Sequence, residues 1–267
     1  MGSFGRSHVP ISAAALKQID EQAARTLRAN LAARKFVDVK GPYGWEYSSV
    51  PVGRSAQFQK SDGVGYGVRL SIPLVEFQVT FELDSLELHN IDRGSSDPDL
   101  TPVERAARTA AAFEDKVVFH GFEHASIKGL ACECVNAAAE LPTDDDDAFI
   151  LAITDAINKM KTEDSITGPY ALVGGKKLQD SLGRITGGRS LYEVIKKNTE
   201  LDEFIRTQSP DDAFLVSKRG GDFELTLGGD FTVGYISRED NTLKFFLAES
   251  FAFRVLEPRA YLPLKLK

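Results

Sequence analysis

The residues best placed to do chemistry are His120, Glu123 and His124, in the segment His120-Gly121-Phe122-Glu123-His124. In some zinc peptidases, two histidines one helical turn apart bind the metal and the intervening glutamate is the general base. That geometry requires a continuous helix, and Gly121 lies inside the pattern, where a helix is expected to end. A structural role is the main interpretation, and a zinc metalloenzyme is the alternative.

Four consecutive carboxylates, Asp144 to Asp147, resemble a calcium or magnesium site at first sight. They lack the ligand spacing and the bidentate glutamate of a calcium loop. Acidic side chains in the first turn of a helix interact favourably with its dipole. We therefore interpret the run as a solvated helix start, and we predict no metal.

The two cysteines and a glycine-rich loop are the remaining candidates for chemistry or ligand binding. Cys132 and Cys134 are one residue apart, too few for a zinc site, and we predict two reduced thiols on one face of an extended segment. The glycines at 183–188 follow neither nucleotide-binding loop pattern and predict a loop tip with a geometric role. The catalytic inventory is thin, so we predict that the chain is not an enzyme.

The composition limits the classes of binding partner that we expect for this chain. The chain has 267 residues, of which 42% are hydrophobic, and a net charge of −7. A mildly acidic chain is a poor candidate for binding nucleic acid, which requires an excess of Lys and Arg. No apolar run is long enough to span a membrane, and the N-terminus lacks a signal-peptide core, so we expect a cytoplasmic protein that binds neither nucleic acid nor membrane.

Helices and strands are mixed without a βαβ rhythm, which predicts an α+β fold. Residues 75–83 alternate strictly between apolar and polar, as in a half-buried strand. Thr101 as a cap, Pro102 in the first turn and Gly121 as a stop predict a long helix. Further helices are predicted at 12–31, after Thr143 and within 178–195, and further strands at 36–39, 170–173, 214–217, 223–227, 231–236 and 243–255.

Residues 48–72 are rich in glycine and polar residues, and they contain few large apolar side chains. Such a stretch cannot bury much surface by itself. It is either a mobile loop or an arm whose partner lies on another chain.

Several spaced blocks resemble the encapsulins, which are bacterial and archaeal shell proteins related to the capsid proteins of tailed phages. The first block is Gly41-Pro42-Tyr43-Gly44-Trp45-Glu46-Tyr47, preceded by residues 34–39. The others are Phe113-Glu114-Asp115, Lys128-Gly129-Leu130, Gly168-Pro169-Tyr170, Arg219-Gly220-Gly221-Asp222-Phe223 and Gly234-Tyr235. They occur in the family's order and at about its spacing, and together they cover essentially the whole chain.

The resemblance implies the major capsid protein fold of tailed phages, with a peripheral domain, an extended loop and an axial domain. The peripheral domain would take residues 1–47, 81–132 and 219–267. The extended loop would be 48–80, and the axial domain 133–218. Gly41, Pro42 and Gly44 would then form the hinge into the arm, with Trp45 and Tyr47 as packing anchors.

The resemblance also implies a self-assembling icosahedral homo-oligomer that encloses a cargo enzyme. The cargo of the family is often a dye-decolourising peroxidase or a ferritin-like iron oxidase, which implies a role in oxidative stress or iron storage. A C-terminal targeting peptide on the cargo would dock between the first helix and the C-terminal sheet. The expected groove residues are Arg34 and Asp38 as polar anchors, with Leu27, Leu31, Phe231 and Val233 as the apolar lining.

Three further expectations follow from the resemblance. The loop at 183–188 would line a pore at the five-fold axis, with Arg184, Thr186 and Arg189 favouring small anions. No flavin is expected, because Ser85-Leu86-Glu87 occupies the segment in which some members carry a flavin-stacking tryptophan. The capsid protein of a virus or prophage remains a second alternative.

Overall fold

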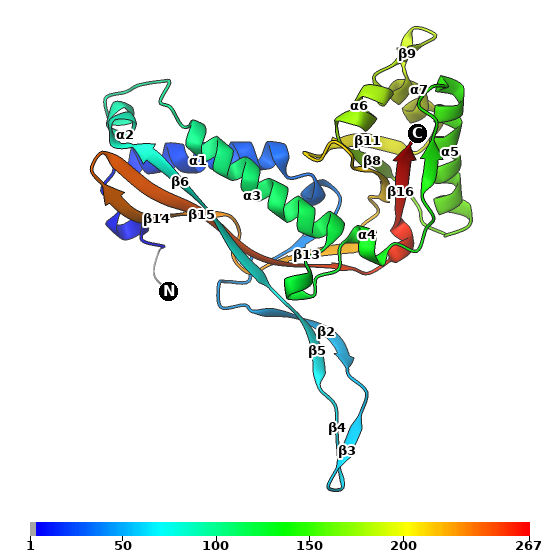
Figure 1. Ribbon diagram of the computed structural model, residues 1–267, viewed down its shortest axis with the longest axis horizontal. Helices are drawn as coiled ribbons and strands as arrows, with labels where there is room; N and C mark the ends of the chain where they lie inside the picture. Colours follow the sequence, from blue (N-terminus) through cyan, green and yellow to red (C-terminus); the bar gives the residue numbers. More distant parts are fainter. Residues whose placement is uncertain (1–3) are drawn as a thin grey trace.

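The computed structural model describes residues 4–267. Two separate sheets organise the chain, and a long β-hairpin arm projects away from both (Figure 1). No helix in this described range is long and apolar enough to cross a membrane. The mixture of helices and strands confirms the predicted α+β class.

The first sheet has five strands arranged around β15 (Thr242–Val255). β15 pairs antiparallel with β6 on one side and with β14 and then β13 on the other. The alternation predicted at 75–83 is confirmed in β6, where Phe81 and Leu83 are buried and Glu82 is exposed. The remaining strands of this sheet are β1 (Asp38–Lys40), β6 (Val75–Asp84), β13 (Phe223–Leu227) and β14 (Thr232–Glu239).

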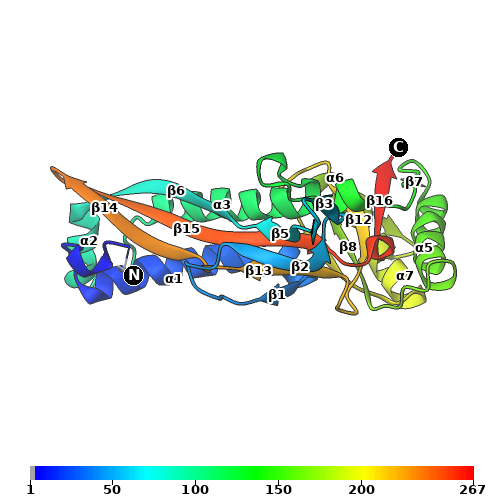
Figure 2. The same cartoon turned by 90° about the horizontal axis from the view of Figure 1, so that it is seen from below.

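Two long helices cover one face of the first sheet (Figure 2). α1 (Ala13–Asn30) begins at the predicted cap, because the Ser12 hydroxyl accepts a hydrogen bond from the Ala15 amide at 3.0 Å. Both helices bury their apolar stripes in one core with the inner residues of β6, β14 and β15. A short helix that the sequence did not suggest, α2 (Ser85–Asp92), follows β6.

The second helix, α3 (Thr101–His120), ends at Gly121 as predicted, where the backbone turns to a φ of +84°. The predicted cap at Thr101 is wrong. Leu100 occupies the cap position, and Thr101 lies in the first turn, where its amide donates to the Asp99 carboxylate at 3.0 Å. The Asp99 carboxylate thus satisfies the first amide of the helix, and the cap residue contributes no side-chain hydrogen bond.

The arm consists of two successive antiparallel strand pairs. β2 (Ser49–Ser55) pairs with β5 (Arg69–Pro73), and β3 (Gln59–Ser61) pairs with β4 (Val64–Tyr66) at the tip. At its base, the Trp45 ring packs directly on Gly229, where an added Cβ would lie 2.1 Å from Trp45 Cε2. The arm ends at Pro73, short of the expected residue 80, because β6 already belongs to the first sheet.

The second sheet has the strand order β11-β8-β12-β16-β7. Its central strands are fully buried beneath three helices. The strands are β7 (Ala139–Leu141), β8 (Tyr170–Gly174), β11 (Leu201–Arg206), β12 (Ala213–Ser217) and β16 (Tyr261–Leu266), and the helices are α5 (Asp146–Thr162), α6 (Lys176–Leu182) and α7 (Leu191–Asn198).

The last strand differs from the expected domain bounds. Residues 219–267 were grouped with the first sheet, but β16 lies between β12 and β7 in the second sheet. The remaining short elements are β9 (Ile185–Thr186), β10 (Arg189–Ser190), α4 (Leu130–Glu133) and the 3-10 helices η1 (Arg6–His8), η2 (Ala33–Lys35), η3 (Glu123–Ala125) and η4 (Pro258–Ala260).

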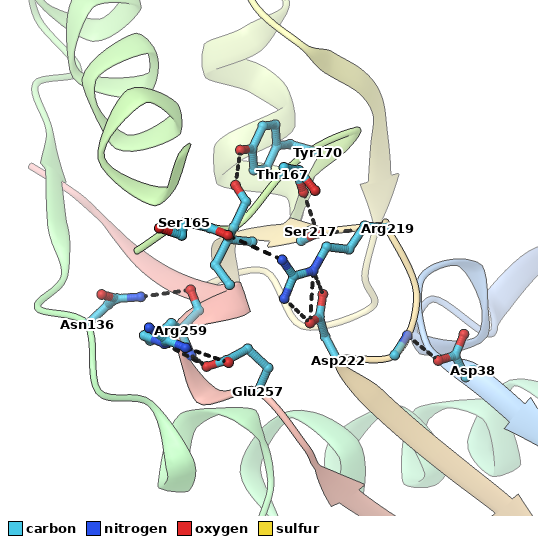
Figure 3. Close-up of polar contacts among 12 residues, drawn as sticks. Asp38, Asn136, Ser165, Thr167, Tyr170, Ser217, Arg219, Asp222, Glu257 and Arg259 are labelled. Carbon is cyan, nitrogen blue, oxygen red and sulfur yellow. Dashed lines mark hydrogen bonds and ion pairs between the residues drawn. The ribbon is translucent and has the colours of Figure 1, made fainter. Parts of the chain in front are cut away.

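A polar cluster ties the two sheets together where the chain passes from β12 to β13 (Figure 3). The Arg219 guanidinium holds the buried Asp222 carboxylate with bonds of 2.7 and 3.0 Å. Arg219 also donates to the Ser165 carbonyl, and the Ser217 hydroxyl donates to the Thr167 carbonyl at 2.9 Å. This cluster fixes how the glycine turn at 220–221 leads into the first sheet.

Candidate functional site

The candidate zinc motif does not form a metal site. α3 ends at His120, and Glu123 and His124 lie in η3 after the reversal at Gly121. The two histidines are therefore not one turn apart on a continuous helix, and His120 Nε2 instead lies 3.3 Å from Asp212 Oδ1. Across residues 4–267, no cluster of three or more His, Cys, Asp or Glu side chains could hold a metal ion.

The other polar motifs have structural roles. The Asp145 carboxylate caps α5 by accepting hydrogen bonds from the amides of Asp147 and Ala148, both at 3.0 Å. The cysteines do not lie on one extended segment as predicted, because Cys132 is an exposed residue of α4 and Cys134 is half-buried just beyond it. Burial raises the pKa of the Cys134 thiol.

A groove of about 410 Å³ runs between α1 and β14. Five of the six residues predicted to bind a cargo peptide line it, namely Leu27, Leu31, Arg34, Phe231 and Val233. Leu27 lies in α1 and Leu31 is the cap residue just after it, whereas Val233 lies in the facing strand β14 and Phe231 directly precedes that strand. Leu247 of β15 completes the apolar wall.

Arg34 closes one end of this groove. Its guanidinium carbon lies 5.1 Å from the centre of the Phe231 ring, and Nη1 lies 3.0 Å from the Asp230 carboxylate. Beneath the surface, Arg34 binds the fully buried carboxylates of Glu114 and Glu249. Arg34 therefore fixes the position of the Phe231 ring on one wall of the groove.

The charges around Arg34 are unequal, because one cation faces three carboxyl groups. Burial, with the neighbouring Glu114 carboxylate, raises the pKa of Glu249 well above its usual range. Burial by itself disfavours the Arg34 cation, yet the Glu114 carboxylate and the other two acids raise its pKa. Arg34 thus stays charged among the three acids.

Asp38 does not join the groove. Its carboxylate accepts a hydrogen bond of 2.6 Å from the Gly221 amide, beside the Arg219–Asp222 pair (Figure 3). The structure thus separates the two expected polar anchors: Arg34 lies at the groove, and Asp38 supports the turn that leads into β13.

No sequence pattern indicated the second arginine, which lies at the other end of the groove. Arg6 donates from Nη1 to Asp20 of α1 at 3.1 Å and to the Val233 carbonyl of β14 at 3.0 Å. Because Arg6 and Val233 are 227 residues apart in sequence, no local pattern could have paired them. The groove is therefore bounded by Arg6 at one end and Arg34 at the other.

The predicted pore loop forms a small hairpin, β9–β10, that projects from the second sheet (Figure 1). Arg189 is exposed there, and Thr186 is half-buried. Arg184 turns back instead: it lies 3.2 Å from Asp146 and donates to the Thr143 carbonyl. Its guanidinium also packs over the Phe149 ring.

A family model described as "Encapsulating protein for peroxidase" matches residues 1–252. Type 1 encapsulin shell proteins are similar over nearly the whole chain. That of Rhodospirillum rubrum is 40% identical, with 99% of this chain and 97% of the relative covered. That of Rhodococcus erythropolis is 34% identical, with 99% and 100% covered.

Solved structures show the same fold at low sequence identity. A virus-like particle from Pyrococcus furiosus superposes with a TM-score of 0.64 at 16% identity, covering 93% of this chain and 98% of that one. The capsid of Myoviridae phage XM1 gives a TM-score of 0.61 at 15% identity, with 90% and 92% covered. The expected phage-capsid fold is confirmed.

Proposed function

Because this chain belongs to the family of type 1 encapsulin shell proteins, we propose that it assembles into a closed icosahedral shell around a cargo enzyme that a C-terminal targeting peptide recruits. A shell protein of this kind has a structural role and is not an enzyme. The capsid of phage XM1 is only 15% identical and shows the fold alone, whereas the identity to type 1 encapsulin shell proteins reaches 40%. Family membership thus favours the cellular shell over a viral capsid.

The arm is the observation that best supports assembly. Phe58, Val64, Tyr66 and Val68 are exposed there, with Phe58 at 70%. The outer part of the arm, residues 54–70, lies outside both cores, and a two-stranded hairpin is at best marginally stable alone in water. Apolar surface of this kind is expected to be buried against another copy of the chain.

Electron microscopy of the protein expressed alone tests the proposal, with uniform hollow particles as the expected result. Deleting residues 54–66 should abolish or enlarge the particles while the chain stays soluble, because neither core loses a residue. Deleting Ser95 and Ser96, in the loop after α2, is the matched control and should leave the particles unchanged. A stable monomer from the full chain, or unchanged particles without the arm, would contradict the proposal.

We propose that the groove between α1 and β14 is the cargo-peptide site, with Leu27, Leu31, Phe231 and Val233 as its apolar walls and Arg34 at one end. A flexible tail that lays apolar side chains into such a groove binds weakly per copy, and many copies in one shell hold the cargo firmly. The description of the family model supports a peroxidase cargo. A ferritin-like iron oxidase is the other candidate, and the neighbouring genes distinguish the two.

We propose that the β9–β10 hairpin lines a pore, with Arg189 and Thr186 facing the opening. Arg184 is a weaker candidate, because its guanidinium is engaged with α5. An exposed arginine at each copy of the hairpin would favour the passage of small anions.

A further inference from the structure

The strand that forms one wall of the groove has a free edge. β14 pairs with β15 on one side, and no strand within residues 4–267 pairs with its other side. A free strand edge presents main-chain donors and acceptors that can pair with an added strand. The groove therefore offers backbone hydrogen bonds as well as apolar side chains.

The hydrogen bonds of β14 show which residues point to this edge. The Tyr235 amide donates to the Phe4 carbonyl at 2.9 Å, and the Val233 carbonyl accepts from Arg6. In an antiparallel sheet, the backbone groups of alternate residues point to the same side. The Val233 amide therefore also faces the groove, between Phe231 and Tyr235.

The N-terminal segment already uses part of this edge. Phe4 lies along it by main-chain pairing, and the Arg6 side chain caps the next carbonyl at Val233. Arg6 is held there by Asp20, so the contact bridges α1 and β14 over the end of the groove. The Arg6 guanidinium thus already donates to the Val233 carbonyl, which an incoming strand would need as a hydrogen-bond acceptor.

One cation at the rim of the groove is left without an acidic partner within residues 4–267. Arg6 faces Asp20, and Arg34 faces Asp230 and the two buried glutamates. Arg28 is exposed on α1 at the rim, donates to the Ala24 carbonyl, and has no acidic partner in the described range 4–267. A carboxylate, such as the terminal one of a cargo tail, would complement it.

We propose that the cargo tail binds as a short β-strand added to the free edge of β14, and that Arg6 is a gate which the tail must displace from the Val233 carbonyl. This inference rests on the proposed function and names the binding mode at the same groove. A strand at this edge directs alternate side chains toward α1, so the matching tail alternates apolar and small polar residues.

The test uses a fluorescent protein carrying an eight-residue C-terminal tail of alternating Leu and Ser, co-expressed with the full-length shell protein. A second tail of the same composition has its four Leu consecutive. Fluorescence retained per purified shell is measured for the wild type, for Arg6→Ala and for Asp20→Asn. Lys17→Ala, which removes an exposed cation of α1 outside the groove, is the matched control.

Freeing one competing hydrogen bond should raise retention of the alternating tail by about fivefold in both Arg6→Ala and Asp20→Asn. Lys17→Ala and the consecutive-Leu tail should show no such gain. Equal retention of the alternating tail by wild type and Arg6→Ala would overturn the gate. Equal retention of the two tails would overturn strand addition while leaving the groove as the docking site. Failure of every variant to retain either tail would count against the groove itself.

Discussion

At the scale of single residues, the buried acids of α3 have the clearest chemical consequences. Asp115 is 4% exposed, and its carboxylate accepts hydrogen bonds from the Ala33 amide at 2.9 Å and the Ala32 amide at 3.0 Å. It therefore holds the segment that joins α1 to η2. Burial outweighs these hydrogen bonds and raises the pKa of Asp115 to about 7.

The pKa of Asp115 predicts a pH dependence of stability. In the unfolded chain its pKa is about 3.9, so the folded state binds more protons between that pH and about 7. The stabilisation is fully present below pH 4 and is lost as pH rises through 7, by at most about 1.4 kcal/mol per pH unit. The urea midpoint of the wild type should therefore fall from pH 4.5 to 7 and level off above.

Asp115→Asn should flatten that fall, because Asn keeps one oxygen for the Ala33 amide but does not titrate. Glu249, whose pKa is also raised by burial, contributes in the same direction, so a weaker slope should remain. Asp97→Asn, at an exposed carboxylate, is the control and should retain the wild-type slope. A slope unchanged in Asp115→Asn would contradict the prediction.

At the scale of elements, the strongest local patterns predicted the fold well. Strict alternation located β6, and the stop at Gly121 located the end of α3. Our prediction from the sequence missed β11 and β16. The strand character of residues 201–206 and 261–266 depends on pairing with distant strands. The resemblance to the family predicted most of the groove residues, but it did not predict Arg6 and Asp20. A side chain that bridges a helix to a distant strand leaves no periodic pattern in the sequence.

The β9–β10 hairpin gives a prediction at the same scale. Arg189→Glu should slow iodide quenching of a fluorescent cargo inside the shell severalfold at low salt, and added salt should reduce the difference. Arg184→Glu should instead lower the thermal midpoint, because it places a carboxylate beside Asp146 and abandons the Thr143 carbonyl. An unchanged quenching rate in Arg189→Glu would argue against the hairpin as a pore lining.

At the scale of the whole molecule, the last strand of the chain returns to the second sheet. It does so more than 40 residues after the chain leaves that sheet at the end of β12. β12 ends at Ser217, the chain then builds three strands of the first sheet, and β16 re-enters the second sheet beside β12. The family match ends at residue 252, so this closing strand lies beyond the matched region. The two sheets are thus joined twice and should unfold together.

Leu262→Asp tests this closure. Leu262 is 1% exposed in β16, and a carboxylate buried there without a partner should cost several kcal/mol. We expect loss of particles and a lower, broader unfolding transition of both sheets, followed by circular dichroism. Lys265→Asp, at an exposed position of the same strand, should assemble normally. Normal particles from Leu262→Asp would mean that β16 is dispensable.

The length of β15 also has a mechanical consequence for a hollow particle. Its 14 residues span roughly 45 Å and run alongside α3, which is roughly 30 Å long (Figure 2). Tension along this direction is carried by covalent backbone and by ladders that must shear all their bonds at once. Tension perpendicular to β15 is instead carried by two-stranded hairpins such as the arm. Each subunit should therefore be stiff along this direction and compliant across it, and the particle should yield first between subunits.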